Sequence, residues 1–234
     1  MDVNTSLPTA PILEELHRQL ASISSTKKEL KWKELTAENL NITYSTLLSQ
    51  SLANTLMEEL EKTIHYYTGD LTKVKIFGKW HQIPRQQVAY GDQGLKYTFS
   101  GTTIAAKPWL PVLTAIKELV EKVSNQSYNF VLINRYRNGN DHIGEHRDDE
   151  KELNKHTPIA SLSLGQERTF VLKHRDARLK GKLYRKIASV KIQLEHGSLL
   201  LMNYPTNEYW YHSLPQRRNC PGVRINLTFR KINS

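Results

Sequence analysis

The chain has a single cysteine, Cys220, among its 234 residues. One cysteine excludes an internal disulfide framework and any zinc site built from several cysteines, and it favours a reducing compartment. No apolar run approaches the ~20 residues that a membrane-spanning helix needs, so we expect no membrane partner. Residues 1–20 lack a basic segment followed by an apolar one, so the sequence predicts no secretory signal.

Acidic residues are also scarce. Asp and Glu number 23 against 33 Lys and Arg, which gives a formal net charge of +10. This excess favours an acidic partner, with nucleic acid the leading candidate, although a merely soluble basic protein has the same balance. Hydrophobic residues make up 38% and charged residues 24%, a composition typical of globular proteins.

Apolar spacing predicts two helices in the first half of the chain. Residues 47–64 and 111–123 carry apolar side chains three or four positions apart, which places them on one helical face. Residues 1–45 are rich in Ser, Thr and Lys and contain one amphipathic stretch. We interpret them as a variable, loosely attached N-terminal arm.

The second half of the chain has the pattern of β-structure. Eight short strand candidates fall between residues 129 and 232, including 185–194, and turn residues separate them. This spacing favours a sandwich or a jelly roll. Further strand-like pieces punctuated by glycines lie between the two predicted helices.

The last predicted strand has two unlike faces. Side chains alternate along a strand, so Arg224, Asn226, Thr228 and Arg230 share one face and apolar side chains share the other. A solvated outer face explains four polar residues as well as a polar interior does. Charge pairs with Lys or Glu are commoner on a solvated face, so we favour a polar interior.

His146 and Asp148 form an H-x-D pair that predicts a metal site. On a strand they share a face, and a later histidine such as His212 completes a set of two histidines and one carboxylate. This set leaves three positions open, as non-haem Fe(II) oxygenases require. A second pair, His174 and Asp176, lies inside a basic run, and we interpret it as a charged surface loop.

Potential donors to an anionic co-substrate flank the metal residues. Asn134 and Tyr136 precede them, and Arg224 and Arg230 follow. A dicarboxylate held near Fe(II) needs a bidentate Arg and neutral donors of this kind. Taken singly, Asn134 has the alternative of closing a turn and Tyr136 of being a core aromatic; together the residues favour an oxygenase.

These motifs resemble the AlkB family of Fe(II)/2-oxoglutarate-dependent nucleic-acid dioxygenases. The resemblance covers roughly residues 70–232 and rests on segments 134–136, 141–150, 210–215 and 224–230. Segments 76–81, 84–85 and 90–101 are similar to the branch of AlkB homologue 2, which acts on duplex DNA.

The resemblance implies an α+β fold. Its core is a double-stranded β-helix (jelly roll), preceded by N-terminal helices and a β-rich nucleotide-recognition lid. The dioxygenase domain is expected over residues 46–234, with the helices and lid in 46–125 and the jelly roll in 126–234.

The resemblance also implies a cofactor set of Fe(II), with 2-oxoglutarate as co-substrate and O₂ as oxidant. Fe(II) is assigned to His146, Asp148 and His212, which are the catalytic residues. 2-Oxoglutarate is assigned to Asn134, Tyr136, Arg224, Asn226, Thr228 and Arg230, with Asn226 as a strand support or a further contact.

The same resemblance implies residues that bind a damaged base. Tyr97 and Phe99 are expected to line its pocket, and Asp149 and Glu150 to meet its polar edge, although these two carboxylates would also suit a solvated turn. Phe77 is expected to be a wedge that fills the space left by an extruded base, where a core residue is the alternative. The full expected set is Phe77, Gly78, Lys79, Arg85, Tyr97, Thr98, Phe99, Asp149 and Glu150.

Basic residues in two later loops are expected to contact the phosphates of DNA, with a disordered basic loop as the alternative. They are Lys173, Arg175, Arg178, Lys180, Lys182, Arg217 and Arg218.

The expected function is oxidative demethylation of N1-methyladenine and N3-methylcytosine, preferentially in double-stranded DNA, with release of formaldehyde and with etheno adducts as further candidates. The alternatives are a related dioxygenase acting on single-stranded DNA or RNA, and a non-catalytic DNA-binding module. We expect a nuclear monomer. Residues 1–45 contain no basic-aromatic-aliphatic-aliphatic-basic motif, so an interaction with the replication clamp is not supported.

Overall fold

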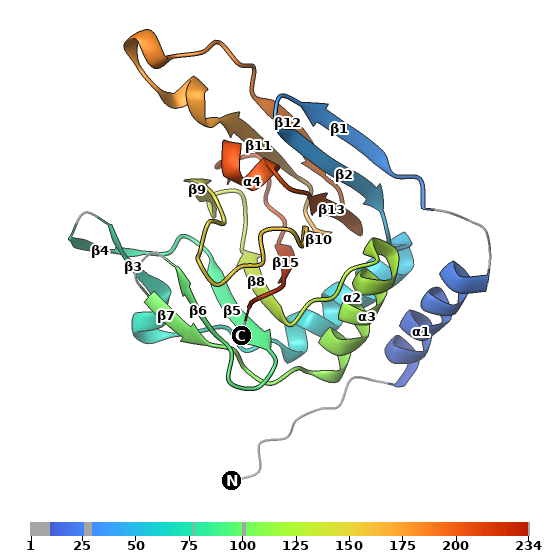
Figure 1. Ribbon diagram of the computed structural model, residues 1–234. Coiled ribbons are helices and arrows are strands. Elements are labelled where there is room, and N and C mark those ends of the chain that lie inside the picture. Colours follow the sequence, from blue (N-terminus) through green and yellow to red (C-terminus); the bar gives the residue numbers. More distant parts are fainter. Residues whose placement is uncertain (1–9, 26–29, 77, 100–101, 234) are drawn as a thin grey trace.

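The computed structural model describes residues 10–25, 30–76, 78–99 and 102–233. Within them, two antiparallel sheets face each other, and helices cover the outer face of the larger one (Figure 1). The expected α+β fold with a double-stranded β-helix core is confirmed. No helix in the described part of the chain is long and apolar enough to cross a membrane.

The larger sheet has seven strands. Every neighbouring pair in it is antiparallel. In spatial order the strands are β1 (Lys33–Ala37), β2 (Leu40–Thr46), β13 (Ser198–Met202), β10 (Ile159–Gly165), β15 (Arg224–Arg230), β8 (Phe130–Tyr136) and β5 (Gln86–Gly91).

The smaller sheet has four strands and supplies the opposite wall of the interior. The expected strand over 185–194 begins only at Val190, and short 3-10 turns at Arg175–Arg178 and Gly181–Leu183 lie in the loop before it. In spatial order the strands are β12 (Val190–Leu194), β11 (Arg168–His174), β14 (Trp210–Leu214) and β9 (Ile143–His146), and a one-turn helix, α4 (Thr206–Tyr209), precedes β14.

Helices α2 (Gln50–Thr63) and α3 (Pro111–Ser124) cover the outer face of the larger sheet, and α1 (Ala10–Ser25) packs against both of them (Figure 1). The hydroxyl of Ser49 caps α2 by accepting from the backbone N–H of Leu52. The predicted helices at 47–64 and 111–123 are confirmed within a few residues, because each carries one continuous apolar face.

Two hairpins lie beside the β5 edge of the larger sheet (Figure 1). One joins β3 (Lys73–Ile76) to β4 (Lys79–Gln82), and the other joins β6 (Lys96–Phe99) to β7 (Thr102–Ala105). The first turns through Gly78, whose φ of +78° strains any residue with a Cβ. These hairpins correspond to the expected β-rich lid.

The expectation of a loosely attached arm is wrong for residues 10–25 and 33–45. Ile12 and Leu16 of α1 are buried where this helix packs against α2 and α3, and residues 42–46 of β2 are paired with β13. The expected boundary between residues 45 and 46 falls inside β2. Thr and Asn residues dilute the short alternation of Leu40 and Ile42, which hides the strand from a search for apolar runs.

The turn between β1 and β2 contacts the loop that follows β11 and the first residue of β14. The carboxylate of Glu38 accepts two hydrogen bonds from Arg185, each 2.7 Å long, and its backbone carbonyl accepts from the indole N–H of Trp210. Arg185 contacts Asp176 as well, at 3.1 Å. The N-terminal hairpin therefore holds the base of the basic loop that follows β11.

Replacing Ile42 tests this placement. Ile42 is fully buried between the sheets, so Ile42→Ala leaves a cavity and is expected to lower the free energy of unfolding by about 2–5 kcal/mol. Thr46→Ala, at the exposed end of the same strand, is the control and is expected to change it by less than about 0.5 kcal/mol. Denaturant unfolding measures both free energies. If both substitutions change the free energy of unfolding by similarly small amounts, β2 does not contribute to the core.

Candidate active site

The two sheets bring His146, Asp148 and His212 together. His146 at the end of β9 is paired with His212 of β14, and their ring centroids lie 4.3 Å apart. One ligand atom from each of the three residues lies within 4.8 Å of the others. Among the described residues, this is the one group of His, Cys, Asp and Glu side chains arranged to hold a metal ion.

Both imidazoles are held in the neutral form that binds metal. Burial lowers the pKa of His146, although Asp148 opposes this. Burial, together with the nearby His146, lowers the pKa of His212 to about 3. The Nδ1 of His146 lies 2.9 Å from the carbonyl oxygen of Gly144, and a proton on Nδ1 leaves the Nε2 lone pair for a metal.

The carboxylate of Asp148 is the third candidate ligand. Burial acts to raise its pKa, but Arg230, whose Nη2 donates to Oδ2 at 2.8 Å, holds it well below its ordinary value. Asn207 fixes the backbone of Asp148 from both sides, because its Oδ1 accepts from the Asp148 N–H and its Nδ2 donates to the Asp148 carbonyl. No motif pointed to Asn207, since its role depends on the fold around α4.

These residues fit Fe(II) by the chemistry of their donors, two neutral imidazoles and one ionised carboxylate. They line a cavity of about 680 Å³ between the two sheets. His146, Asp148 and His212 would hold the ion there.

The polar face of β15 points into this cavity, as predicted. Arg224 and Arg230 are both buried, with 2% and 4% of their surface exposed. Arg224 donates to Ser163 Oγ at 2.9 Å, yet its Nε has no partner among the described residues, and neither do Nε and Nη1 of Arg230. Burial lowers the pKa of Arg224 to about 10, which keeps it cationic at neutral pH. Buried cationic donors without partners fit the carboxylates of 2-oxoglutarate.

The neutral residues assigned to 2-oxoglutarate fall into two kinds. Asn134 accepts from Arg85 Nε at 2.7 Å through Oδ1, which leaves its amide nitrogen as a donor. Asn226 instead uses both amide hydrogens on β10, on Ser161 Oγ and the carbonyl of Leu162, and accepts from Thr228. We therefore assign Asn226 to supporting the strand. Tyr136 is buried and also lines the cavity.

Several residues expected to bind the base line the same cavity. Tyr97 is 1% exposed and lies 5.0 Å from the ring of Phe130. Glu150 is mostly buried, and burial together with Asp148 raises its pKa. Asp149, which pairs with Arg147 at 2.7 Å, is more exposed at the same wall. The alternative of a solvated turn does not hold for Glu150.

The remaining residues expected to bind the base differ in their positions. Thr98 does not line the cavity, because its hydroxyl pairs with that of Thr103 on the neighbouring strand of the lid. Arg85 does line it, through its bond to Asn134. Gly78 and Lys79 are exposed on the β3–β4 hairpin. Phe77 and the side chain of Phe99 lie outside the described residues.

The expected phosphate contacts separate into paired and unpaired cations. Arg178 pairs with Glu145 at 2.8 Å and stacks on Tyr211, 3.7 Å from the ring centroid, while Arg147 lies 5.0 Å from that centroid. Lys173 also pairs with Glu145, and Arg175 pairs with Asp176. The exposed members that form no ion pair within the described part of the chain are Lys180, Lys182, Arg217 and Arg218.

The second H-x-D pair is not a surface loop at its histidine. His174 is 1% exposed and packs edge-on against Trp210, with ring centroids 5.2 Å apart. Its Nδ1 accepts from the backbone N–H of Asp176. The earlier interpretation is therefore wrong for His174, which is a core residue at the end of β11.

Comparison with known proteins agrees with this geometry. Residues 41–230 match the family described as the 2OG-Fe(II) oxygenase superfamily. The chain belongs to this superfamily and, within it, to the AlkB family. The oxygenase is 54% identical over 201 residues to the DNA oxidative demethylase ALKBH2 of Homo sapiens, covering 86% of this chain and 77% of that one.

Two further comparisons support the assignment. The oxygenase is 52% identical over 209 residues to the DNA oxidative demethylase ALKBH2 of Mus musculus, covering 89% of this chain and 87% of that one. The solved structure of OsALKBH1 matches with a TM-score of 0.58 at 16% identity, covering 85% of this chain and 100% of that one. This last likeness shows the fold.

Removing Arg224 tests the co-substrate site. Arg224→Ala takes one partner from a buried ionic contact, which costs roughly 2–5 kcal/mol, so the KM for 2-oxoglutarate is expected to rise about 30-fold or more. Arg18→Ala on the exposed face of α1 is the control. Calorimetric titration with 2-oxoglutarate measures the affinity directly. An unchanged affinity would remove Arg224 from the site.

Proposed function

We propose that the oxygenase is a DNA oxidative demethylase that removes the methyl groups of N1-methyladenine and N3-methylcytosine, with a preference for duplex DNA and with etheno adducts as further substrates. The observation that carries the proposal is one shared cavity. In it the metal residues and the acidic wall at Asp149 and Glu150 meet two buried arginines that retain donor atoms without partners among the described residues. The names of the relatives support DNA as the substrate.

The charge of the cavity fits methylated bases. N1-methyladenine and N3-methylcytosine are cationic, whereas the unmodified bases are neutral. A cation beside Asp149 and Glu150 gains attraction that a neutral base lacks, and it offsets the effect of burial on Glu150. The acidic wall therefore selects the damaged base.

Each part of the site has a separate task. Fe(II), when bound, supplies with 2-oxoglutarate and O₂ the oxidising chemistry that releases the methyl group as formaldehyde. Arg224 and Arg230 orient the dicarboxylate, and Arg230 also keeps Asp148 ionised through its 2.8 Å contact. Tyr97 and the buried walls of the cavity keep water from the reacting groups.

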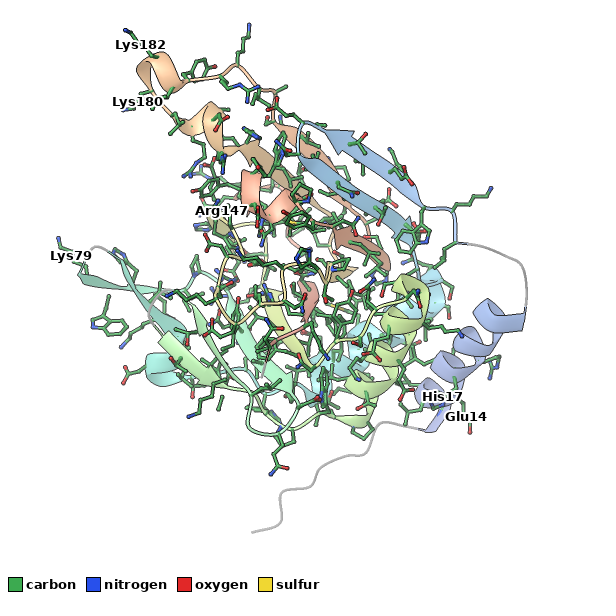
Figure 2. The ribbon with its side chains drawn as sticks, viewed as in Figure 1. Glu14, His17, Lys79, Arg147, Lys180 and Lys182 are labelled. Atoms are coloured by element: carbon green, nitrogen blue, oxygen red, sulfur yellow. The ribbon has the colours of Figure 1, made fainter. Side chains whose placement is uncertain are left out.

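Two projecting segments support a duplex substrate. Figure 2 shows Lys79 on the β3–β4 hairpin, Lys180 and Lys182 at the end of the loop after β11, and Arg147 between them on the same side of the molecule. A duplex bound across this side would meet cations at both ends. We infer that the oxygenase acts there as a monomer, in the nucleus, on alkylated double-stranded DNA.

The assay that tests the function uses matched single- and double-stranded oligonucleotides carrying 1-methyladenine or 3-methylcytosine. Formaldehyde and succinate release are both expected, with faster turnover on the duplex, and Asp148→Ala is expected to abolish both while DNA binding remains. Succinate without demethylation would favour another substrate. Demethylation confined to single strands or RNA would favour the related dioxygenase, and binding without either product would favour a non-catalytic module.

Salt dependence reports how many phosphates are contacted. Of the cations expected to contact DNA, Lys79, Lys180, Lys182, Arg217 and Arg218 are exposed and form no ion pair with another described residue. If all five engage, the logarithm of duplex affinity is expected to fall with the logarithm of salt concentration with a slope of about −4 to −5. Fluorescence anisotropy across a salt series measures the slope. A flat response would make these cations ordinary surface residues.

Phe77 distinguishes a duplex enzyme from a single-strand enzyme. A duplex costs a few kcal/mol to open, and an inserted aromatic ring returns roughly 1–3 kcal/mol by stacking. Phe77→Ala is therefore expected to lose about 5- to 150-fold on duplex DNA and far less on a single strand. Equal losses on both substrates together with a lower melting temperature would identify Phe77 as a core residue.

A further inference from the structure

Gln87 is a buried polar residue that none of the tasks above uses. It lies on β5, is 2% exposed, and lines the active-site cavity. Its Oε1 and Nε2 both lack a hydrogen-bond partner among the described residues. Buried polar side chains are nearly always satisfied, so an amide left without partners at a cavity wall indicates a ligand contact.

The sheet register places Gln87 in line with known site residues. Gln87 of β5 is paired with Asn134 of β8, which is paired with Asn226 of β15. Directly paired residues on neighbouring strands project from the same face. Gln87, Asn134 and Asn226 therefore form one row of amide side chains across three neighbouring strands, and Gln87 is the member nearest to the lid.

The other two amides of this row already have partners. Asn134 accepts from Arg85 through its oxygen and keeps only its amide nitrogen, which is assigned to 2-oxoglutarate, and Asn226 uses both amide hydrogens on β10. The carboxamide of Gln87 thus retains its acceptor and both donors within the described structure.

The position of β5 favours the base over 2-oxoglutarate as the partner of Gln87. β5 is the edge strand beside the hairpins, and β8 separates it from β15, which carries Arg224 and Arg230. Two strand spacings of about 4.8 Å therefore lie between Gln87 and the strand of the arginines. Tyr97 of the lid lines the same cavity.

We propose that the carboxamide of Gln87 donates a hydrogen bond to the extruded base and favours 3-methylcytosine over 1-methyladenine. This inference rests on the proposed function. The methylated nitrogen of 3-methylcytosine lies between the O2 carbonyl and the exocyclic amino group, whereas that of 1-methyladenine lies between a C–H group and the amino group. A donor on the carbonyl side therefore finds an acceptor only in the cytosine.

Two carboxylates of the same cavity supply the complementary contact. Asp149 and Glu150 follow β9 of the smaller sheet, while Gln87 belongs to the larger one. A base held between the sheets presents its amino group, present in both lesions, to the carboxylates and its other edge to Gln87. The carboxylates recognise both methylated bases, and Gln87 distinguishes one from the other.

The test replaces the amide with an apolar side chain of similar length, Gln87→Met. Loss of one neutral hydrogen bond is expected to lower the ratio of kcat/KM for 3-methylcytosine to that for 1-methyladenine roughly threefold to tenfold, in otherwise identical duplexes. Anaerobic titration of the enzyme loaded with Fe(II) and 2-oxoglutarate is expected to show the same change in the ratio of duplex affinities.

The matched control is Gln86→Met. Gln86 is the preceding residue of β5, projects from the opposite face, and accepts from Arg135 at 2.8 Å. Its substitution is expected to leave the ratio between the two lesions as in the unsubstituted enzyme. Melting temperatures of both variants separate a loss of folding from a loss of recognition.

Two outcomes would overturn the inference. An equal loss on both lesions would make Gln87 a packing residue, and a raised KM for 2-oxoglutarate with an unchanged ratio would assign it to the co-substrate. Failure of the proposed function is recognised separately, because the unsubstituted enzyme would then demethylate neither lesion.

Discussion

The ion pair between Arg230 and Asp148 connects the parts of the active site. Arg230 comes from the larger sheet and Asp148 follows β9 of the smaller one, so the 2.8 Å contact joins the two walls of the cavity. Both side chains are almost fully buried, and either charge left alone there would be costly. The pair keeps the carboxylate ionised beside two neutral imidazoles, and it leaves Nε and Nη1 of Arg230 without partners among the described residues.

The arrangement of strands explains why residues far apart in the sequence share one cavity. β15 lies between β8 and β10, so its polar face meets Asn134 on one side and Ser161 and Ser163 on the other. Its apolar face packs under the helices. One strand with strict alternation thus contributes to both the hydrophobic core and the catalytic interior. A shift of its pairing register by one residue would turn the polar side chains toward the helices and the apolar ones into the cavity.

Much of this was predictable from the sequence, and the exceptions have physical reasons. The alternation of polar and apolar residues predicted the polar face of β15, and the H-x-D pair predicted the metal residues, because both patterns lie within a few consecutive residues. β2 escaped notice because its apolar residues are few, and His174 was misjudged because its burial depends on Trp210, 36 positions later along the chain. Gln87 carried no motif, and only its pairing with Asn134 places it at the cavity.

Ion pairs hold both ends of the basic loop at residues 178–185, which lowers the entropy that DNA binding would cost. Arg178 is tied to Glu145 and stacks on Tyr211, and Arg185 is tied to Glu38. Both ends of the projecting segment are therefore anchored before DNA arrives, and only the short stretch from 179 to 184 has no such anchor. Ordering a few residues costs far less conformational freedom than ordering a long loop, so we expect the N-terminal hairpin to favour DNA binding by preorganising this loop.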